Sequence, residues 1–305
     1  MALKTKKYNN ITWINIVEPD ANDIKYLTDN YKFHPLDIKD IRGEAQRSKI
    51  DIYTSYAFMI LQFPVTYKDN GHLGSHELDI FLGKDYVITI QKKKLKSLNH
   101  YFYKIANNKK LQGEVFKGRA AQVLYHILDH LYRSSFTIID WLSKEINRIE
   151  QEVYEENTRQ AVKDLAKLRR NVLTYKSFID PQRFVAQTLA NLQKDYLSSD
   201  MANYFDDILD HIKRIYTALV NGKELIDGLH ETNESLISHR LNRVIKILTI
   251  FSVSMLPLTL LTGLYGMNLQ TLPLIHNEQM VWYIFGGLTV IIVGMFIWLK
   301  KKDII

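Results

Sequence analysis

The sequence contains no cysteine, which excludes a disulfide framework, a cysteine-ligated zinc site, an iron–sulfur cluster and thiol catalysis. It also lacks a glycine-rich loop of the kind that cradles nucleotide phosphates. The 305 residues carry a net charge of +7, and 46% of them are hydrophobic and 24% charged. This composition is typical of a folded chain and excludes a disordered one.

Charged residues are nearly absent from one part of the chain. Between Ile247 and Leu299 there is no lysine, arginine or aspartate, and Glu278 is the one acidic residue. Two apolar segments occupy this region, at about residues 244–264 and 281–299, and each approaches the roughly 20 residues with which a helix crosses a bilayer. A buried core helix of a soluble protein rarely stays free of charge for so long. We therefore predict two transmembrane helices.

The residues that flank these segments predict their orientation. Three basic residues lie before or at the very start of the first segment, and three follow the second: Arg240, Arg243, Lys246, Lys300, Lys301 and Lys302. By the positive-inside rule, both ends of the pair face the cytoplasm. We expect a multi-pass protein of the cell membrane with cytoplasmic N- and C-termini, an outer loop at about residues 265–280 and a lysine-rich tail at residues 300–305.

Residues 1–242 are predicted to form a cytoplasmic α/β domain, and residues 243–305 a transmembrane pore domain. Segments rich in β-branched and aromatic residues predict strands at 11–17, 56–65, 76–82 and 86–90. Helical patterns follow at 21–31, from residue 34, at 114–156 and at 158–196. Pro181 is expected to kink or divide the last of these helices. A small mixed sheet with flanking helices results.

A third long helix is predicted from Asp200 to Tyr265. It meets no proline before Pro257, which already lies inside the first apolar segment, so one continuous helix can join the two domains. A bend at Gly222 and Gly228 is the alternative. A stripe of mostly small or polar residues, here called the polar stripe, follows this helix at a period of about 3.5 residues. It comprises Gly228, Glu231, Ser235, Ser238, Asn242, Ile245, Thr249, Ser252, Leu256, Thr259, Gly263 and Gly266. A polar stripe at membrane depth must face protein or water. It either lets neighbouring helices pack closely or lines a water-filled path, and a path requires a symmetric oligomer.

The tetrapeptide Tyr265-Gly266-Met267-Asn268 follows the first apolar segment and resembles the signature of the CorA family of magnesium channels. The resemblance covers most of the chain in family order. It includes Phe33-His34-Pro35-Leu36 with Asp40-Ile41, residues 77–82, Tyr204-Phe205 with Asp207, Asp210 and His211, then Pro257-Leu258-Thr259 and Lys300-Lys301-Lys302.

The resemblance implies a funnel-shaped homopentamer, with an α/β/α sandwich, a long stalk helix that continues as the pore-lining helix, and a second membrane helix. It implies a passive Mg²⁺ uptake channel that is driven by the membrane potential, and no enzymatic activity. Gly266, Met267 and Asn268 would form the outer selectivity filter. Together with the polar stripe, the resemblance assigns the pore lining to Asn242, Ile245, Leu248, Thr249, Ser252, Leu256, Thr259 and Gly263.

Family members are held closed by cytoplasmic Mg²⁺ bound between neighbouring subunits, so the resemblance implies a second role for this ion. Asp207 matches the family position, and Asp206 and Asp210 lie nearby. A solvated acidic face balanced by basic neighbours is the alternative for these three residues. The resemblance also needs a partner carboxylate from the N-terminal domain, for which Glu77, Asp79 and Asp85 are the candidates.

Other functions are compatible with the same sequence features. A transporter of Zn²⁺, Co²⁺ or Ni²⁺ would share the same signature, and a membrane-tethered coiled-coil sensor or scaffold would not conduct at all. His126 and His130 have a metal-ligand spacing, but Asp129 stands where a zinc protease motif needs glutamate. The basic run at residues 92–94 lacks interleaved aromatic residues, so no nucleic acid is expected. The expected partners are copies of the chain, the bilayer and divalent cations.

Overall fold

The computed structural model describes residues 3–67, 71–154, 158–192, 194, 196–197, 201–267 and 278–302, with the backbone alone at residues 158, 159, 278 and 281. The chain forms two compact units, residues 1–230 and 231–305. Helix α7 (Ala202–Tyr265) contributes to both units. The predicted domain boundary between residues 242 and 243, drawn where the chain was expected to enter a bilayer, stays a prediction.

The first unit contains a six-stranded sheet with the order β1-β2-β6-β5-β4-β3. Its strands are β1 (Leu3–Tyr8), β2 (Ile11–Val17), β3 (Lys49–Ile52), β4 (Tyr56–Thr66), β5 (Leu73–Gly83) and β6 (Tyr86–Gln91). Only β2 and β6 pair in parallel; the other pairs are antiparallel. The four central strands were predicted from their apolar content. The edge strands β1 and β3 were not, because none of their residues is buried and their sequences are largely polar.

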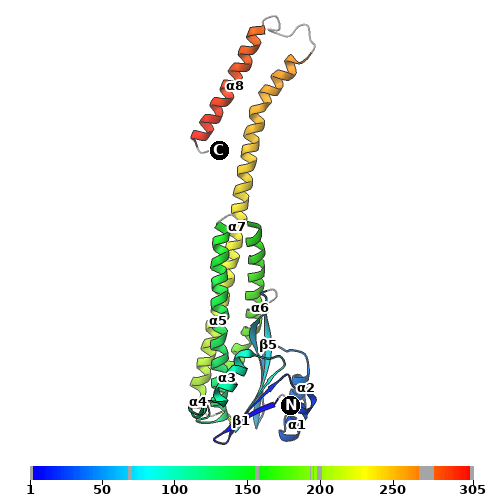
Figure 1. Ribbon diagram of the computed structural model, residues 1–305, viewed down its shortest axis with the longest axis vertical. Helices are drawn as coiled ribbons and strands as arrows, with labels where there is room; N and C mark the ends of the chain where they lie inside the picture. The colour runs from blue at the N-terminus through cyan, green and yellow to red at the C-terminus, as the bar shows by residue number, and fades with distance from the viewer. Residues whose placement is uncertain are drawn as a thin grey trace. The chain divides into compact units, whose positions relative to one another are not determined.

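Helices cover both faces of the sheet (Figure 1). On one face, Ile24 of α1 (Ala21–Asn30) and Ile41 of α2 (Pro35–Arg42) join the core that includes Phe58 and Phe81. On the other face, Trp13 packs edge-on against Phe102 of α3 (Lys96–Ala106), with ring centroids 4.9 Å apart. Helices α4 (Lys109–Val115), α5 (Ala120–Tyr154) and α6 (Thr158–Asn191) complete this second layer. The predicted α/β/α sandwich is confirmed.

Local sequence explains where the first two helices begin. Asp20 caps α1 by accepting a hydrogen bond from the backbone N–H of Asp23 at 2.8 Å, and the Asp23 carboxylate accepts one from the Asp20 N–H in return. His34 caps α2, whose first residue is Pro35, a residue without an N–H to leave unpaired. Both caps satisfy backbone donors that a helix start would otherwise leave open.

Pro181 does not divide α6, which runs unbroken from Thr158 to Asn191. The expected division was wrong, because packing outweighs the lost backbone hydrogen bond, while a kink at Pro181 stays a prediction. Phe178, Val185 and Leu189 are buried on both sides of the proline. The neighbouring Gln182 also ties this turn to the sheet, because its amide donates to the Gln62 carbonyl at 2.7 Å.

Helix α7 is continuous over 64 residues, as predicted, and contains Pro257 without interruption. Within residues 231–305, α8 (Glu278–Lys301) runs back along the last part of α7 (Figure 1). The rings of Tyr265 and Phe285 lie 6.4 Å apart, which places the first part of α8 beside the end of α7.

Candidate functional site

Two helices contain a stretch that is long and apolar enough to cross a bilayer, α7 and residues Trp282–Lys301 of α8. In α7 this stretch is the last part, which from residue 244 onward has no acidic residue. Hardly any residues of the two stretches are buried in the single chain. Leu248 and Leu256 on α7, for example, are 64% and 65% exposed. A core helix of a soluble protein would be covered, whereas contiguous exposed apolar surface of this extent marks a membrane or protein interface. The two stretches coincide with the predicted transmembrane segments.

One face of the membrane part of α7 packs inside the second unit. Its covered residues recur every three or four positions, and among them Ser254 is 2% exposed. The full set is Ile250, Ser254, Pro257, Leu258, Leu261 and Tyr265. Tyr265 of this set contacts Phe285 of α8, and α8 runs back along α7 (Figure 1), so we call this the α8-facing side of α7.

The residues predicted to line a pore lie on the other side of α7. All eight of them are exposed in the single chain: Asn242, Ile245, Leu248, Thr249, Ser252, Leu256, Thr259 and Gly263. At about 100° per residue, their mean direction is about 180° from that of the α8-facing residues. The polar stripe therefore does not serve the packing of α8 against α7 within one chain. Its role in a pore stays a prediction.

Hydroxyl groups on this stripe already donate a hydrogen bond. The Oγ1 atom of Thr249 donates to the Ile245 carbonyl at 2.8 Å, and Thr259 donates to the Met255 carbonyl at 2.9 Å. Ser252 does the same to Leu248 at 2.8 Å. Because a hydroxyl keeps acceptor capacity after donating, these oxygens still present lone pairs away from the helix. Such a surface can accept hydrogen bonds from water.

Helix α7 ends at the signature. The N–H of Gly266 donates to the Thr262 carbonyl at 2.9 Å, and a Cβ atom at Gly266 would lie 2.9 Å from that same oxygen. A side chain at this position would thus collide with backbone, which explains the glycine. Met267 follows and is 51% exposed. Asn268, the third residue of the predicted filter, lies outside the described residues.

A second set of chemically active residues lies between α5 and α7 in the first unit. Asp129 of α5 and Asp207 and His211 of α7 each offer a ligand atom, and these atoms all lie within 4.8 Å of one another. The Nε2 atom of His211 is 3.1 Å from Asp129 Oδ1 and 3.7 Å from Asp207 Oδ2. Among the described residues, this acidic cluster is the one group of three or more such residues with metal-binding geometry.

Two neighbours shape the charge of the acidic cluster. The hydroxyl of Tyr125 donates to Asp207 Oδ2 at 3.0 Å, and burial together with this hydrogen bond raises the pKa of Tyr125 to about 12. The Nε atom of Arg133 lies 2.6 Å from Asp129 Oδ1. His211 is buried and Asp129 half-buried, whereas the Asp207 side chain is 46% exposed, so the cluster is open to solvent on the Asp207 side. Oxygen and imidazole ligands of this kind suit a divalent cation.

The other predicted regulatory residues do not join the acidic cluster. Asp206 is exposed, and Asp210 is exposed and pairs with Lys213 at 3.4 Å. Glu77 is buried, with its Oε1 atom 2.5 Å from the ammonium group of Lys92. Asp79 is fully buried, and burial and the nearby Glu77 charge raise its pKa well above its ordinary value. Asp85 is exposed in the turn between β5 and β6.

Sequence reasoning therefore missed two members of the acidic cluster, Asp129 and His211. His211 stands four residues after Asp207, so their shared helix face was a usable signal. Asp129 lies 78 positions before Asp207, and no local pattern links them. His126 and His130 stay outside the cluster; His130 stacks on Tyr101 with centroids 4.1 Å apart, and burial lowers the pKa of both histidines.

Curated proteins of similar sequence span nearly the whole chain. The cobalt/magnesium transport protein CorA of Thermotoga maritima is 29% identical over 293 residues, which cover 95% of this chain and 82% of that protein. The putative metal ion transporter YfjQ of Bacillus subtilis is 26% identical over 290 residues, with 95% and 88% covered.

The fold is also found in solved structures. The complete structure of the CorA magnesium transporter from Methanocaldococcus jannaschii superposes with a TM-score of 0.82 at 20% identity, and covers 97% of this chain and 92% of that one. The full-length CmaX protein gives a TM-score of 0.74 at 21% identity, with 95% and 88% covered. The family model of the CorA-like Mg²⁺ transporter protein matches residues 8–301, and the chain therefore belongs to that family.

Proposed function

We propose that this membrane transporter is a passive channel for Mg²⁺ uptake, formed by several copies of the chain around a common axis. The observation that carries the proposal is the division of α7 into an α8-facing side and an opposite polar stripe. The hydroxyls of the stripe donate to carbonyls of α7 itself, but their remaining lone pairs at membrane depth favour protein or water over lipid, and α8 of the same chain lies on the other side. Copies of the chain that turn this stripe inward would enclose a wet path. A homopentamer, as the sequence resemblance implies, is the arrangement we expect.

The outer end of α7 would select the ion. Mg²⁺ holds its water shell tightly and prefers octahedral oxygen ligands, so neutral amide and carbonyl oxygens can bind the hydrated ion without stripping it. Gly266, Met267 and Asn268 offer such groups. A neutral ring also lets the ion leave again, which conduction requires.

The membrane potential would drive uptake. Two positive charges that cross about 100 mV gain about 4.6 kcal/mol, at roughly 2.3 kcal/mol per charge. Inward movement of the cation requires the cytoplasmic face of the membrane to be electrically negative. The basic flanks predict that both termini lie on that face. No nucleotide hydrolysis is needed for such a movement.

Cytoplasmic Mg²⁺ would close the channel by binding at the acidic cluster of Asp129, Asp207 and His211. The cluster is open to solvent at Asp207 and joins α5 to α7, the helix that continues to the pore. An ion bound there would hold α7 against α5. A carboxylate from a neighbouring copy would complete the site, and of Glu77, Asp79 and Asp85 only Asp85 has an exposed side chain.

Co²⁺ is the second candidate cargo. The Thermotoga maritima relative is named for both cobalt and magnesium transport. The signature itself does not separate the two ions.

The proposal is tested with the full chain in proteoliposomes that contain a Mg²⁺-sensitive dye. An inside-negative potassium diffusion potential should start Mg²⁺ influx, and reversal of the potential should stop it. Competing Co²⁺, Ni²⁺ and Zn²⁺ rank the ions in the same assay. Absence of voltage-dependent influx, or a monomer in single-particle images of the purified protein, would contradict a multimeric channel.

A further inference from the structure

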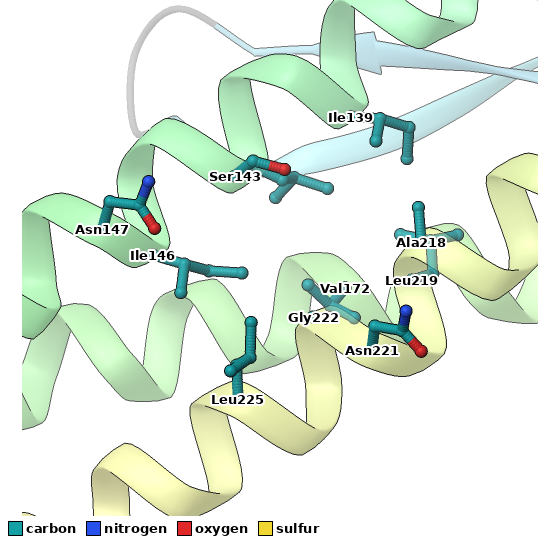
Figure 2. A pocket seen from close by; sticks show the side chains of 11 residues that line it. Ile139, Ser143, Ile146, Asn147, Val172, Ala218, Leu219, Asn221, Gly222 and Leu225 are labelled. Carbon is teal, nitrogen blue, oxygen red and sulfur yellow. The ribbon is translucent and has the colours of Figure 1, made fainter.

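A cleft of about 250 Å³ lies between α5, α6 and α7 in the first unit (Figure 2). None of the residues of the acidic cluster lines it, and its residues precede the segment at about 244–264 that the sequence predicts to cross the membrane. The floor of the cleft is aliphatic, and each of its side chains is at most 9% exposed: Ile139, Leu142, Ile146, Val172 and Leu219. The three helices thus supply a preformed apolar surface.

A glycine on α7 leaves the space open. A Cβ atom at Gly222 would meet one neighbour within 4 Å, the Cδ1 atom of Ile146 at 3.4 Å, which is an ordinary contact. Gly222 is buried, so the hollow beside it is bounded by other side chains rather than by solvent alone. Figure 2 shows Ile146 of α5 and Leu225 of α7 on either side of the hollow.

The mouth of the cleft is polar but uncharged. Ser143, Asn147 and Asn221 stand there, and all three are exposed. Within the part of the chain that the structure describes, none of these side chains makes a hydrogen bond. No lysine, arginine, histidine, aspartate or glutamate belongs to the lining. Neutral donors and acceptors therefore surround an apolar floor.

We propose that this cleft binds a small neutral organic molecule that has one apolar ring or short alkyl body and one hydrogen-bonding group. The apolar body would displace water from the aliphatic floor, and the polar group would bond to the amides at the mouth. A charged molecule is excluded, because no opposite charge repays the loss of its hydration. An engineered apolar cavity of about 150 Å³ holds benzene, so the size of this cleft suits a substituted single ring.

The test uses the full-length protein in detergent and 4-fluorophenol as a probe, followed by fluorine NMR. We expect saturable binding of 4-fluorophenol and none of 4-fluorobenzoate, which has the same ring with a negative charge. Gly222→Leu should abolish the saturable signal, because the new side chain fills the hollow. Gly228→Leu is the matched control on the same helix, since a Cβ atom there would meet nothing within 4 Å and the residue does not line the cleft. The detergent takes up the same amount of probe with either variant, so a difference between the two variants reports binding in the cleft.

Two further measurements separate loss of the site from loss of the fold. Asn221→Leu alters the exposed mouth without entering the packed floor, and should weaken binding by removing the hydrogen bond. Thermal melting of Gly222→Leu should be no lower than that of Gly228→Leu, because the leucine buries apolar surface. The proposal is overturned if the unaltered protein shows no saturable binding, if 4-fluorobenzoate binds as well, or if Gly228→Leu loses the signal equally.

Discussion

The Nε2 atom of His211 lies 3.1 Å from the Oδ1 atom of Asp129, although the two residues are 82 positions apart in the sequence. This contact joins α5 to α7 close to the N-terminal end of α7. Since α7 continues without a break to Tyr265, any group that strengthens the contact acts on the helix that carries the polar stripe. A divalent cation is such a group, because its two positive charges would attract both carboxylates, Asp129 of α5 and Asp207 of α7.

Removal of one carboxylate from the acidic cluster should weaken closure by internal Mg²⁺. For Asp129→Asn, we expect the half-inhibitory Mg²⁺ concentration to rise by about tenfold or more, as is typical when a metal site loses a partner. Asp207→Ala should shift it in the same direction. The measurement is current through planar bilayers during Mg²⁺ addition on the cytoplasmic side. Asp210→Asn, on the exposed surface of α7, is the control and should leave inhibition unchanged; unaltered inhibition in Asp129→Asn would count against the site.

Asn268→Ala should abolish selective Mg²⁺ uptake without preventing assembly. The physical reason is the loss of the amide oxygen that would contact the water shell of the ion at the outer mouth. Uptake into proteoliposomes and the mass of the purified oligomer are the two measurements. Asn277→Ala removes an asparagine of the same predicted outer loop and should retain uptake. Normal selective uptake by Asn268→Ala would refute the role of this residue.

Leu256→Ser should raise Mg²⁺ leak through the closed channel. Leu256 lies on the exposed polar stripe, where a ring of leucines would close a narrow path by excluding water, and serine would let water in. Leu258→Ser is the control, because Leu258 lies on the α8-facing side about 200° away around the helix. Flux at high internal Mg²⁺ measures the leak. An equal leak in the two variants would show that the stripe does not face the path.

Asp79→Asn should flatten the pH dependence of stability. Burial raises the pKa of Asp79 well above its ordinary value of 3.8, so the folded state holds this proton more tightly than the unfolded state does. The resulting stability is fully present below that ordinary value and is lost as pH rises toward the raised pKa. At pH 8, we expect Asp79→Asn to increase the apparent melting temperature by about 2–4 °C, and near pH 4 the difference should vanish.

The control for this series is Asp85→Asn, which changes an exposed carboxyl of the same domain. Its melting temperature should follow that of the unaltered protein across the pH range. If Asp79→Asn melts lower than the unaltered protein at pH 8, Asp79 is held ionised by a partner and the expected sign is wrong.

Features that depend on local composition and periodicity were predictable from the chain alone. The two membrane segments follow from a lack of charge, the four central strands from β-branched and aromatic content, and the continuity of α7 from the absence of proline before Pro257. The edge strand β1 was missed because only its pairing with β2, and not its own polar sequence, makes it a strand. The expected division of α6 at Pro181 was wrong, because the packing that keeps this helix continuous involves other elements and is not encoded in the local sequence.

Which residues that are far apart in the sequence lie close together in space was decided by the tertiary structure. The meeting of Asp129 with Asp207 and His211 depends on how α5 packs against α7, which no spacing along the chain encodes. The same holds for the two sides of the membrane part of α7. Their residue types were readable in the sequence, but which side α8 covers became known only when both helices were placed together, because contact is a property of surfaces in space.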